Sequence, residues 1–172
     1  LMNITFLGGG NMANALIGGL LKQGTRPADL CVIEVDAAAR GRLAATHGIP
    51  CLAHVDNGLP ADGLIVLAVK PQQMQSAVAP LAGRLSRQIV VSIAAGLRLS
   101  DLSRWLGDYD KLVRAMPNTP ALISSGVTGL FALPSVSEAE RLGAERVLQS
   151  VGSTLWVNDE TQIDAVTAIS GS

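Results

Sequence analysis

Residues 3–21 decide the fold, and they read NITFLGGGNMANALIGGLL. Residues 3–7 are mostly apolar and predict a strand, and three glycines follow directly. Apolar residues then recur at helical spacing, which predicts a helix that ends at Gly24. A strand that passes through a glycine-rich turn into a helix is typical of the first unit of an α/β sheet.

The glycine-rich turn has the pattern G-x-G-x-x-A, formed by Gly8, Gly10 and Ala13. Gly8 permits the tight turn, Gly10 lets an anion approach the backbone, and Ala13 lets the helix pack on the strand. The helix N-terminus adds unpaired N–H groups and a partial positive charge. Because strand, turn and helix stand in the right order, we interpret the turn as a dinucleotide-binding turn rather than an ordinary glycine-rich turn.

The second predicted strand, residues 30–34, ends in Glu34, and Asp36 follows two residues later. An acid at this position can accept both ribose hydroxyls of NAD and repels the 2′-phosphate of NADP. Arg40 and Arg42 are close enough in the sequence to compete for that phosphate. The acids therefore favour NAD only weakly, and NADP or NAD remains open as the cofactor. The alternative is that Glu34 and Asp36 are solvated charges at a strand end.

The remaining chain alternates short apolar strands with amphipathic stretches. This pattern predicts an α/β fold, a doubly wound, Rossmann-type, mostly parallel sheet with helices on both faces. Further strands are expected at residues 51–53, 64–69, 89–93, 112–116, 127–133 and 153–157. Helices are expected at residues 37–47, at 72–85 with a kink or a break at Pro80, at 100–106 capped by Ser100, at 137–150 behind a capping box, and from Asp159 onward.

The composition narrows the function classes. The chain has 172 residues and a formal net charge of −1, with 48% hydrophobic and 3% aromatic residues. A near-neutral chain with few aromatic residues is not expected to bind nucleic acid. We see no uncharged apolar run of about 18 residues and no signal peptide, so we expect a cytoplasmic protein without a membrane span. The histidines and cysteines lack metal-ligand spacing, and no metal site is expected.

Polar or small segments follow three of the predicted strands, at residues 70–71, 92–96 and 116–120. The carboxyl ends of parallel strands lie at one edge of a doubly wound sheet, where ligands bind. Small residues at 94–96 would let backbone amides approach a cofactor. Asn118 and Thr119 carry hydrogen-bonding groups on a loop flanked by prolines, which suits a carboxamide or a substrate. The alternative for each segment is an ordinary connection.

Five segments together resemble pyrroline-5-carboxylate reductase, in order and over essentially the whole chain: residues 8–12, 68–72, 92–96, 116–120 and 163–172. The resemblance implies hydride transfer from NADPH or NADH to the C=N carbon of 1-pyrroline-5-carboxylate, giving L-proline in proline biosynthesis. It also implies a homo-oligomer, a dimer or larger. We therefore expect a dinucleotide-binding domain at residues 2–158, and at 159–172 the start of a truncated all-helical domain that dimerises and forms much of the substrate pocket.

The resemblance also implies the site residues. The cofactor-binding residues would be Gly8, Gly9, Gly10, Asn11, Met12, Glu34, Asn57, Ala68, Val69, Lys70, Pro71, Ile93, Ala94, Ala95 and Asn118. The catalytic residues would be Asn118 and Thr119, near the nicotinamide, and Glu160, which would approach the substrate. The alternative for Glu160 is a solvated charge in the first turn of a helix. The family often has a small polar residue where Glu34 stands, which bears on the choice between NADPH and NADH.

Two other functions remain open. One is a β-hydroxyacid dehydrogenase, which shares a similar nucleotide-binding domain. The other is a chain that binds a dinucleotide without turnover. If the last helix packs on a second domain, we expect an exposed apolar patch around Ile163, Val166 and Ile169.

Overall fold

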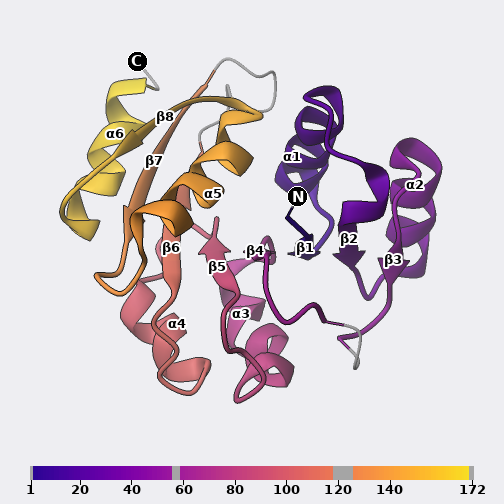
Figure 1. The fold of residues 1–172 in the computed structure, drawn as a ribbon, viewed down its shortest axis with the longest axis horizontal. Helices are drawn as coiled ribbons and strands as arrows, with labels where there is room; N and C mark the ends of the chain where they lie inside the picture. The colour runs from indigo at the N-terminus through magenta and orange to yellow at the C-terminus, as the bar shows by residue number, and fades with distance from the viewer. Residues whose placement is uncertain (1, 56–58, 118–125, 171–172) are drawn as a thin grey trace.

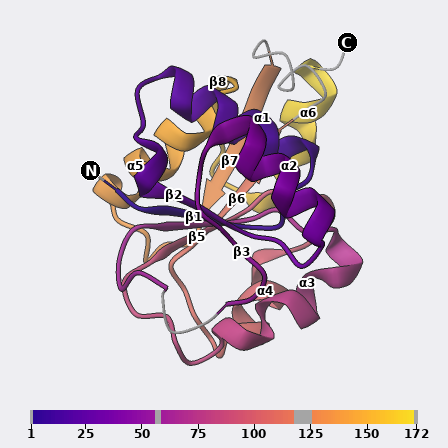
Figure 2. The ribbon, with the colours of Figure 1, turned by 90° about the vertical axis from the view of Figure 1, so that its right-hand side faces the viewer.

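The computed structural model describes residues 2–55, 59–117 and 126–170, with side chains described as far as residue 166. Within these ranges eight strands form one sheet, in the order β3-β2-β1-β4-β5-β6-β7-β8 (Figure 1). Neighbouring strands from β3 to β6 run parallel, β7 is antiparallel to β6, and β8 is parallel to β7. Helices flank the sheet on both faces (Figure 2). The prediction of a doubly wound, mostly parallel sheet is confirmed.

The elements follow the predicted order. The strands are β1 (Ile4–Leu7), β2 (Leu30–Ile33), β3 (Cys51–Leu52), β4 (Leu64–Leu67), β5 (Ile89–Ser92), β6 (Leu112–Met116), β7 (Gly126–Ala132) and β8 (Gly152–Trp156). The α-helices are α1 (Asn11–Lys22), α2 (Ala37–His47), α3 (Pro71–Val78), α4 (Leu99–Trp105), α5 (Glu138–Gln149) and α6 (Ile163–Ser170). In the described part of the chain, no helix has the length and apolar character needed to cross a membrane.

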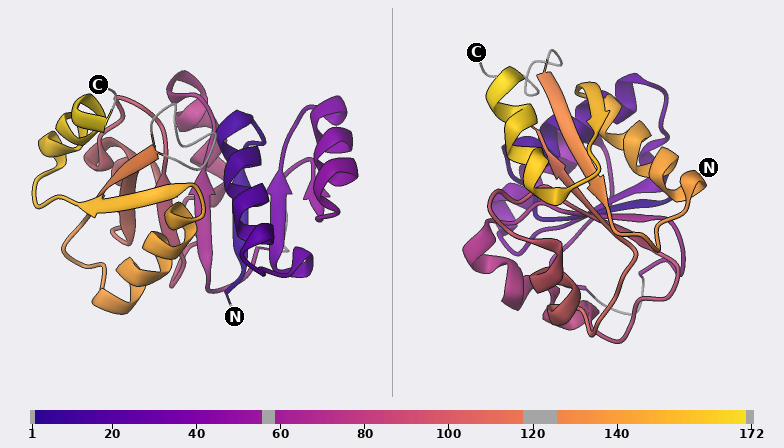
Figure 3. Two further views of the ribbon diagram at one scale, coloured as in Figure 1. Left: turned by 90° about the horizontal axis from the view of Figure 1, so that it is seen from above. Right: turned by 90° about the vertical axis from the view of Figure 1, so that its left-hand side faces the viewer.

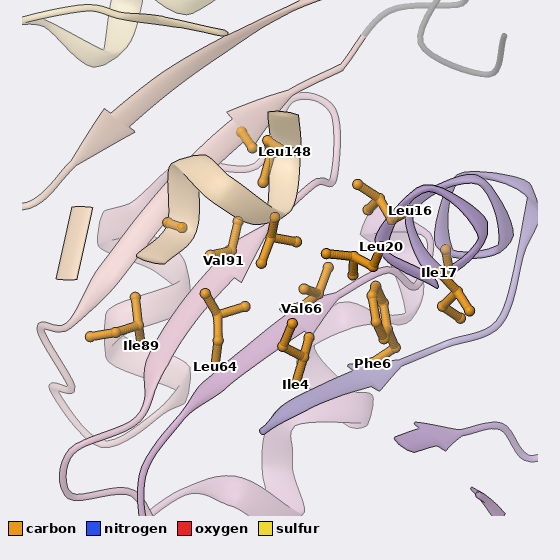
Figure 4. Close-up of a cluster of buried hydrophobic side chains, with 14 of the residues drawn as sticks. Ile4, Phe6, Leu16, Ile17, Leu20, Leu64, Val66, Ile89, Val91 and Leu148 are labelled. Atoms are coloured by element: carbon orange, nitrogen blue, oxygen red, sulfur yellow. The ribbon is translucent and has the colours of Figure 1, made fainter. Parts of the chain in front are cut away.

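The sheet is buried on both faces, because side chains along each strand point alternately to two separate cores. In β1, Ile4 and Phe6 join the core under α1 and α5, where Phe6, Leu16 and Leu148 lie together (Figure 4). Leu7 points to the opposite core, which contains Met74 of α3 and Leu102 of α4. This double burial explains why the central strands are almost continuously apolar in the sequence.

Three helices differ in part from their predictions. The helix expected from Asp159 onward begins at Ile163, and Glu160–Gln162 forms a 3₁₀ turn (η4) capped by Asp159. The helix expected to reach residue 85 ends at Val78, and Ala79–Leu81 forms a 3₁₀ turn (η2), because Pro80 has no N–H to continue the helix. The helix α4 is not capped by Ser100, since its N-cap position is Arg98. The Leu99 N–H of α4 donates instead to Oε2 of Glu160, 61 residues later, at 3.0 Å.

The last helix, α6, lies beside β7 (Figure 3). The expectation of an exposed apolar patch is wrong for Ile163 and Val166, which are 0% and 7% exposed. Both side chains pack against Gly129 of β7, where a Cβ atom would lie 3.2 Å from each residue. The side chain of Ile169 lies outside the described residues. A glycine in β7 thus makes room for the apolar face of α6 on the sheet.

The first testable prediction concerns the contact between α1 and α5. A Cβ atom on Gly19 would collide with the backbone oxygen of Ser150, whereas on Gly18 it would meet only His47 Cε1 at 3.9 Å. Alanine favours a helix over glycine by about 1 kcal/mol at either position. We therefore expect Gly19→Ala to lower the free energy of unfolding by about 2 kcal/mol, and Gly18→Ala to raise it slightly. Urea unfolding of both variants measures this; equal effects would contradict the packing.

The second prediction concerns Glu160, whose Oε2 also accepts a hydrogen bond from Nη1 of Arg114 at 3.1 Å. The Arg114 side chain is 6% exposed, so removing its partner leaves a buried charge unpaired. We expect Glu160→Ala to destabilise the protein by about 3 kcal/mol. The control is Asp164→Ala, an exposed acid in the first turn of α6. If thermal unfolding shows the same stability for both variants, the ion pair does not stabilise the fold.

Candidate dinucleotide-binding site

A cavity of about 580 Å³ opens at the carboxyl ends of β1, β2 and β4. Its walls are the glycine-rich turn after β1, residues 33–35 at the end of β2, residues 53–55 after β3, residues 68–70 after β4, and one face of α3. The volume lies within the range of known ligand sites. In open α/β sheets, ligands bind outside the carboxyl ends of the strands, which is where this cavity lies.

The three glycines of the turn have different surroundings. Gly8 has a φ of +100°, and a Cβ atom there would lie 2.8 Å from the carbonyl oxygen of Ala68. At Gly9 a Cβ atom would collide with the side chain of Leu43. At Gly10 nothing lies within 4 Å of the Cβ position, so the backbone is open to the cavity. This open backbone at the N-terminus of α1 fits a pyrophosphate.

Glu34 lies across the turn and is not a solvated charge. Its Oε1 accepts a hydrogen bond from the Gly9 N–H at 3.1 Å, and its Oε2 accepts one from the Asp36 N–H at 3.0 Å. Asp36 has a different role, since its carboxylate caps α2 by accepting the Ala39 N–H at 2.9 Å. Of the two acids, Glu34 therefore lines the cavity.

Arg40 is held at the end of β2 by backbone oxygens. Its Nη1 donates to the carbonyl oxygens of Glu34 at 2.9 Å and of Val35 at 3.0 Å. These bonds place a positive charge beside the acid at the edge of the cavity. The guanidinium retains further N–H groups for another acceptor, because it carries five donors in all.

A second pair of side chains supports the turn from behind. Nδ2 of Asn14, in the first turns of α1, donates to the Gly9 oxygen at 3.1 Å and to the Gly10 oxygen at 3.0 Å. Oδ1 of Asn14 lies 3.0 Å from Nε2 of His47, the last residue of α2. Partial burial lowers the pKa of His47 below its usual value, which favours the neutral ring.

The structure brings seven of the predicted cofactor-binding residues into the cavity wall: Gly8, Gly9, Gly10, Glu34, Ala68, Val69 and Lys70. The others in the described ranges stand at the same edge but outside the wall. Asn11 and Met12 begin α1, Pro71 begins α3, and Ile93, Ala94 and Ala95 follow β5. Asn57, Asn118 and Thr119 lie outside the described residues. Glu160 is hydrogen-bonded to Arg114 and to the Leu99 N–H and does not line the cavity. Its role toward a substrate stays a prediction.

Sequence reasoning did not identify the face of α3 that closes the cavity. Gln73, Ser76 and Ala77 line it, at the helical spacing i, i+3 and i+4, and Pro80 of the following 3₁₀ turn η2 extends this wall. The signal was present, because this helix begins directly after Lys70 at the ligand-binding edge of the sheet. Val35, which is 74% exposed on the opposite wall, was also missed.

Comparisons with known proteins agree with this geometry. Residues 3–96 match the family model described as NADP oxidoreductase, coenzyme F420-dependent. Over 98% of its length the chain is 44% identical to the pyrroline-5-carboxylate reductase of Pseudomonas aeruginosa, of which it covers 62%. A pyrroline-5-carboxylate reductase structure from Coxiella burnetii matches 98% of the chain, with a TM-score of 0.91 and 35% identity, and the match covers 63% of that protein.

A Plasmodium falciparum pyrroline carboxylate reductase, solved with NADP bound, matches 99% of the chain at 25% identity with a TM-score of 0.82, and the match covers 62% of that protein. The chain thus spans about 62% of the length of the P. aeruginosa relative. These findings confirm the resemblance to pyrroline-5-carboxylate reductases over this chain's length, and the chain belongs to the family described as NADP oxidoreductase, coenzyme F420-dependent.

Proposed function

We propose that this chain is the nucleotide-binding part of an NAD(P)H-dependent enzyme that reduces 1-pyrroline-5-carboxylate to L-proline. The observation that carries the proposal is the cavity beneath the glycine-rich turn, in a chain 44% identical to the P. aeruginosa reductase. The backbone of the turn faces free space at Gly10, beside the N-terminus of α1. These features suit the pyrophosphate of a nicotinamide dinucleotide.

In this proposal the chain binds and orients the cofactor. The N–H groups at the start of α1 hold the pyrophosphate, Glu34 faces the adenosine ribose, and residues 68–71 run toward the nicotinamide. The bound nicotinamide supplies the hydride that the C=N carbon accepts. Asn118 and Thr119 would position the nicotinamide end, and Glu160 would act toward the substrate. No acid–base pair is required of this chain, since the imine nitrogen can be protonated from water.

The length of the relatives suggests where the domain for oligomerisation and substrate binding lies. Because the chain covers only 62% of the P. aeruginosa protein, we propose that residues 159–172 lead into an all-helical domain that forms the homo-oligomer and much of the substrate pocket. The activity then belongs to the whole protein, while the dinucleotide binds here.

The third prediction tests the reaction. We expect the full-length protein to oxidise NADPH or NADH only when 1-pyrroline-5-carboxylate is added, and to release L-proline. Residues 2–172 alone should bind the reduced cofactor with little turnover, since the proposed substrate pocket is incomplete. Absorbance of the reduced nicotinamide measures the turnover of each protein, and fluorescence titration measures cofactor binding by residues 2–172. Reduction of NAD(P)⁺ by a β-hydroxyacid, without imine reduction, would instead indicate a β-hydroxyacid dehydrogenase.

The fourth prediction tests the choice between NADPH and NADH. Glu34 lies at the end of β2, where its charge would repel a 2′-phosphate. Glu34→Gln keeps the side-chain length and removes this charge, so we expect affinity for NADPH to rise about tenfold relative to NADH. Fluorescence titration with both nucleotides measures the ratio.

A matched control for this ratio is Asp36→Asn, two residues away. It removes an equal charge and keeps a good helix cap, because asparagine and aspartate cap helices about equally well. The ratio should stay within about twofold of the unsubstituted protein, since screening weakens charges that do not face the phosphate. If both variants shift the ratio equally, general charge rather than Glu34 sets the preference.

A further inference from the structure

Asn14 stands one residue beyond the glycine motif, and its side chain is hydrogen-bonded to the turn. Its Nδ2 donates to two consecutive backbone oxygens, those of Gly9 and Gly10. Asparagine is a weak helix former, because its side chain competes for backbone hydrogen bonds. An asparagine in the first turns of α1 is therefore explained by these bonds rather than by helix stability.

The two bonds orient two peptide groups. The described peptide bonds are all trans, so each N–H points opposite to the C=O of the same peptide group. The Gly9 oxygen belongs to the peptide group of the Gly10 N–H, and the Gly10 oxygen to that of the Asn11 N–H. The Gly10 oxygen also accepts the backbone N–H of Asn14 at 3.0 Å, the first hydrogen bond of the helix, so the side chain adds a second bond to that peptide group. The Gly9 oxygen is held by the Asn14 side chain. Both N–H groups therefore point to the other side, at the helix N-terminus.

The Gly9 N–H is not available for an anion, because it donates to Oε1 of Glu34. The N–H groups of Gly10 and Asn11 are thus the first donors that the turn offers. The first N–H groups of a helix have no partner within the helix. An anion at this end of α1 would meet donors whose direction is already set by Asn14.

The two backbone oxygens determine which way the Asn14 amide faces, and the amide in turn determines the tautomer of His47. Carbonyl oxygens only accept hydrogen bonds, so the Asn14 atom that faces the Gly9 and Gly10 oxygens must be Nδ2. Oδ1 then faces Nε2 of His47 at 3.0 Å, and Nε2 must carry a hydrogen. The flipped amide would place an oxygen against two oxygens and an NH₂ group against an N–H.

We propose that Asn14, held by His47, is a positioning residue that fixes the Gly10 and Asn11 N–H groups toward the pyrophosphate of the bound dinucleotide. The pair does not touch the cofactor and acts through the backbone of the turn. This inference rests on the proposed function for the identity of the anion, but the hydrogen-bonded arrangement itself does not.

The first test is nucleotide binding by variants of the full-length protein. Asn14→Ala removes both side-chain bonds to the turn but keeps the backbone N–H bond to the Gly10 oxygen. Because the helix preference of alanine offsets part of the loss, the protein should stay folded, with a modest fall in the melting temperature without ligand. The Kd for the preferred reduced nucleotide should rise about tenfold, and that for adenosine, which has no phosphate, less than twofold. Asn14→Asp should weaken nucleotide binding further, because a carboxylate cannot donate to the two oxygens.

Lys22→Ala is the control for these measurements. Lys22 is exposed in the last turn of α1, about 17 Å along the helix from Asn11, which exceeds the screening length at physiological salt. Its Kd should match that of the unsubstituted protein. If Asn14→Ala binds the nucleotide as tightly as the control, or loses adenosine and nucleotide affinity equally, the positioning role is overturned.

The second test examines His47. Nitrogen NMR of the neutral ring should show the hydrogen on Nε2, and Asn14→Ala should remove this preference. His47→Phe should raise the nucleotide Kd about threefold. His47→Gln retains an N–H donor, so its Kd should match that of the unsubstituted protein. A hydrogen on Nδ1 in the unsubstituted protein would overturn the inference. Failure of the unsubstituted protein to bind either nucleotide would overturn the proposed function. The NMR measurement of the His47 tautomer would still test the hydrogen bond between Asn14 and His47, because it does not depend on nucleotide binding.

Discussion

The structure depends on the backbone at the end of β1, which is hydrogen-bonded to the ends of β2 and β4 on its two sides. The Gly8 N–H donates to the Ile33 oxygen of β2 at 2.9 Å, and the Ala68 N–H donates to the Leu7 oxygen at 2.8 Å. The backbone is thus bonded on both sides, and Gly8 has no room for a Cβ atom against Ala68. A side chain there would push β4 away and open the sheet where the cavity forms. A glycine at position 8 is therefore required by packing as well as by its positive φ in the turn.

A turn made of glycines has a second requirement. Glycine loses more conformational freedom on folding than any other residue, so three in succession form a poorly determined surface unless other groups hold them. Here Leu43 packs against Gly9, Glu34 accepts its N–H, and Asn14 donates to its oxygen. These side chains come from α2, the end of β2 and α1. The binding surface is backbone, but its rigidity comes from side chains at separate places in the sequence.

Local patterns predict what local forces determine. The apolar strands, the capping box of Ser137 and Glu140, and the glycine-rich turn were all readable, since each depends on neighbours within a few residues. The cap of α4 could not be predicted, because the acceptor of the Leu99 N–H is Glu160, 61 residues away. The bond between Asn14 and His47 spans 33 residues and was missed for the same reason. The buried position of α6 depends on a single glycine, Gly129, whose place opposite the helix only the sheet register reveals.

Glu34 shows how the support of the turn and the choice of cofactor are coupled. Its carboxylate brings negative charge to the cavity, at the end where we propose that the ribose binds, and also accepts the Gly9 N–H. A small polar residue at this position would remove the charge and release that N–H toward an anion. Such a change would favour a 2′-phosphate and add a donor near the pyrophosphate, while loosening Gly9. Asn14 would still hold the Gly9 oxygen from the other side, so the turn could tolerate a change of cofactor preference at Glu34 without losing the direction of the next two N–H groups.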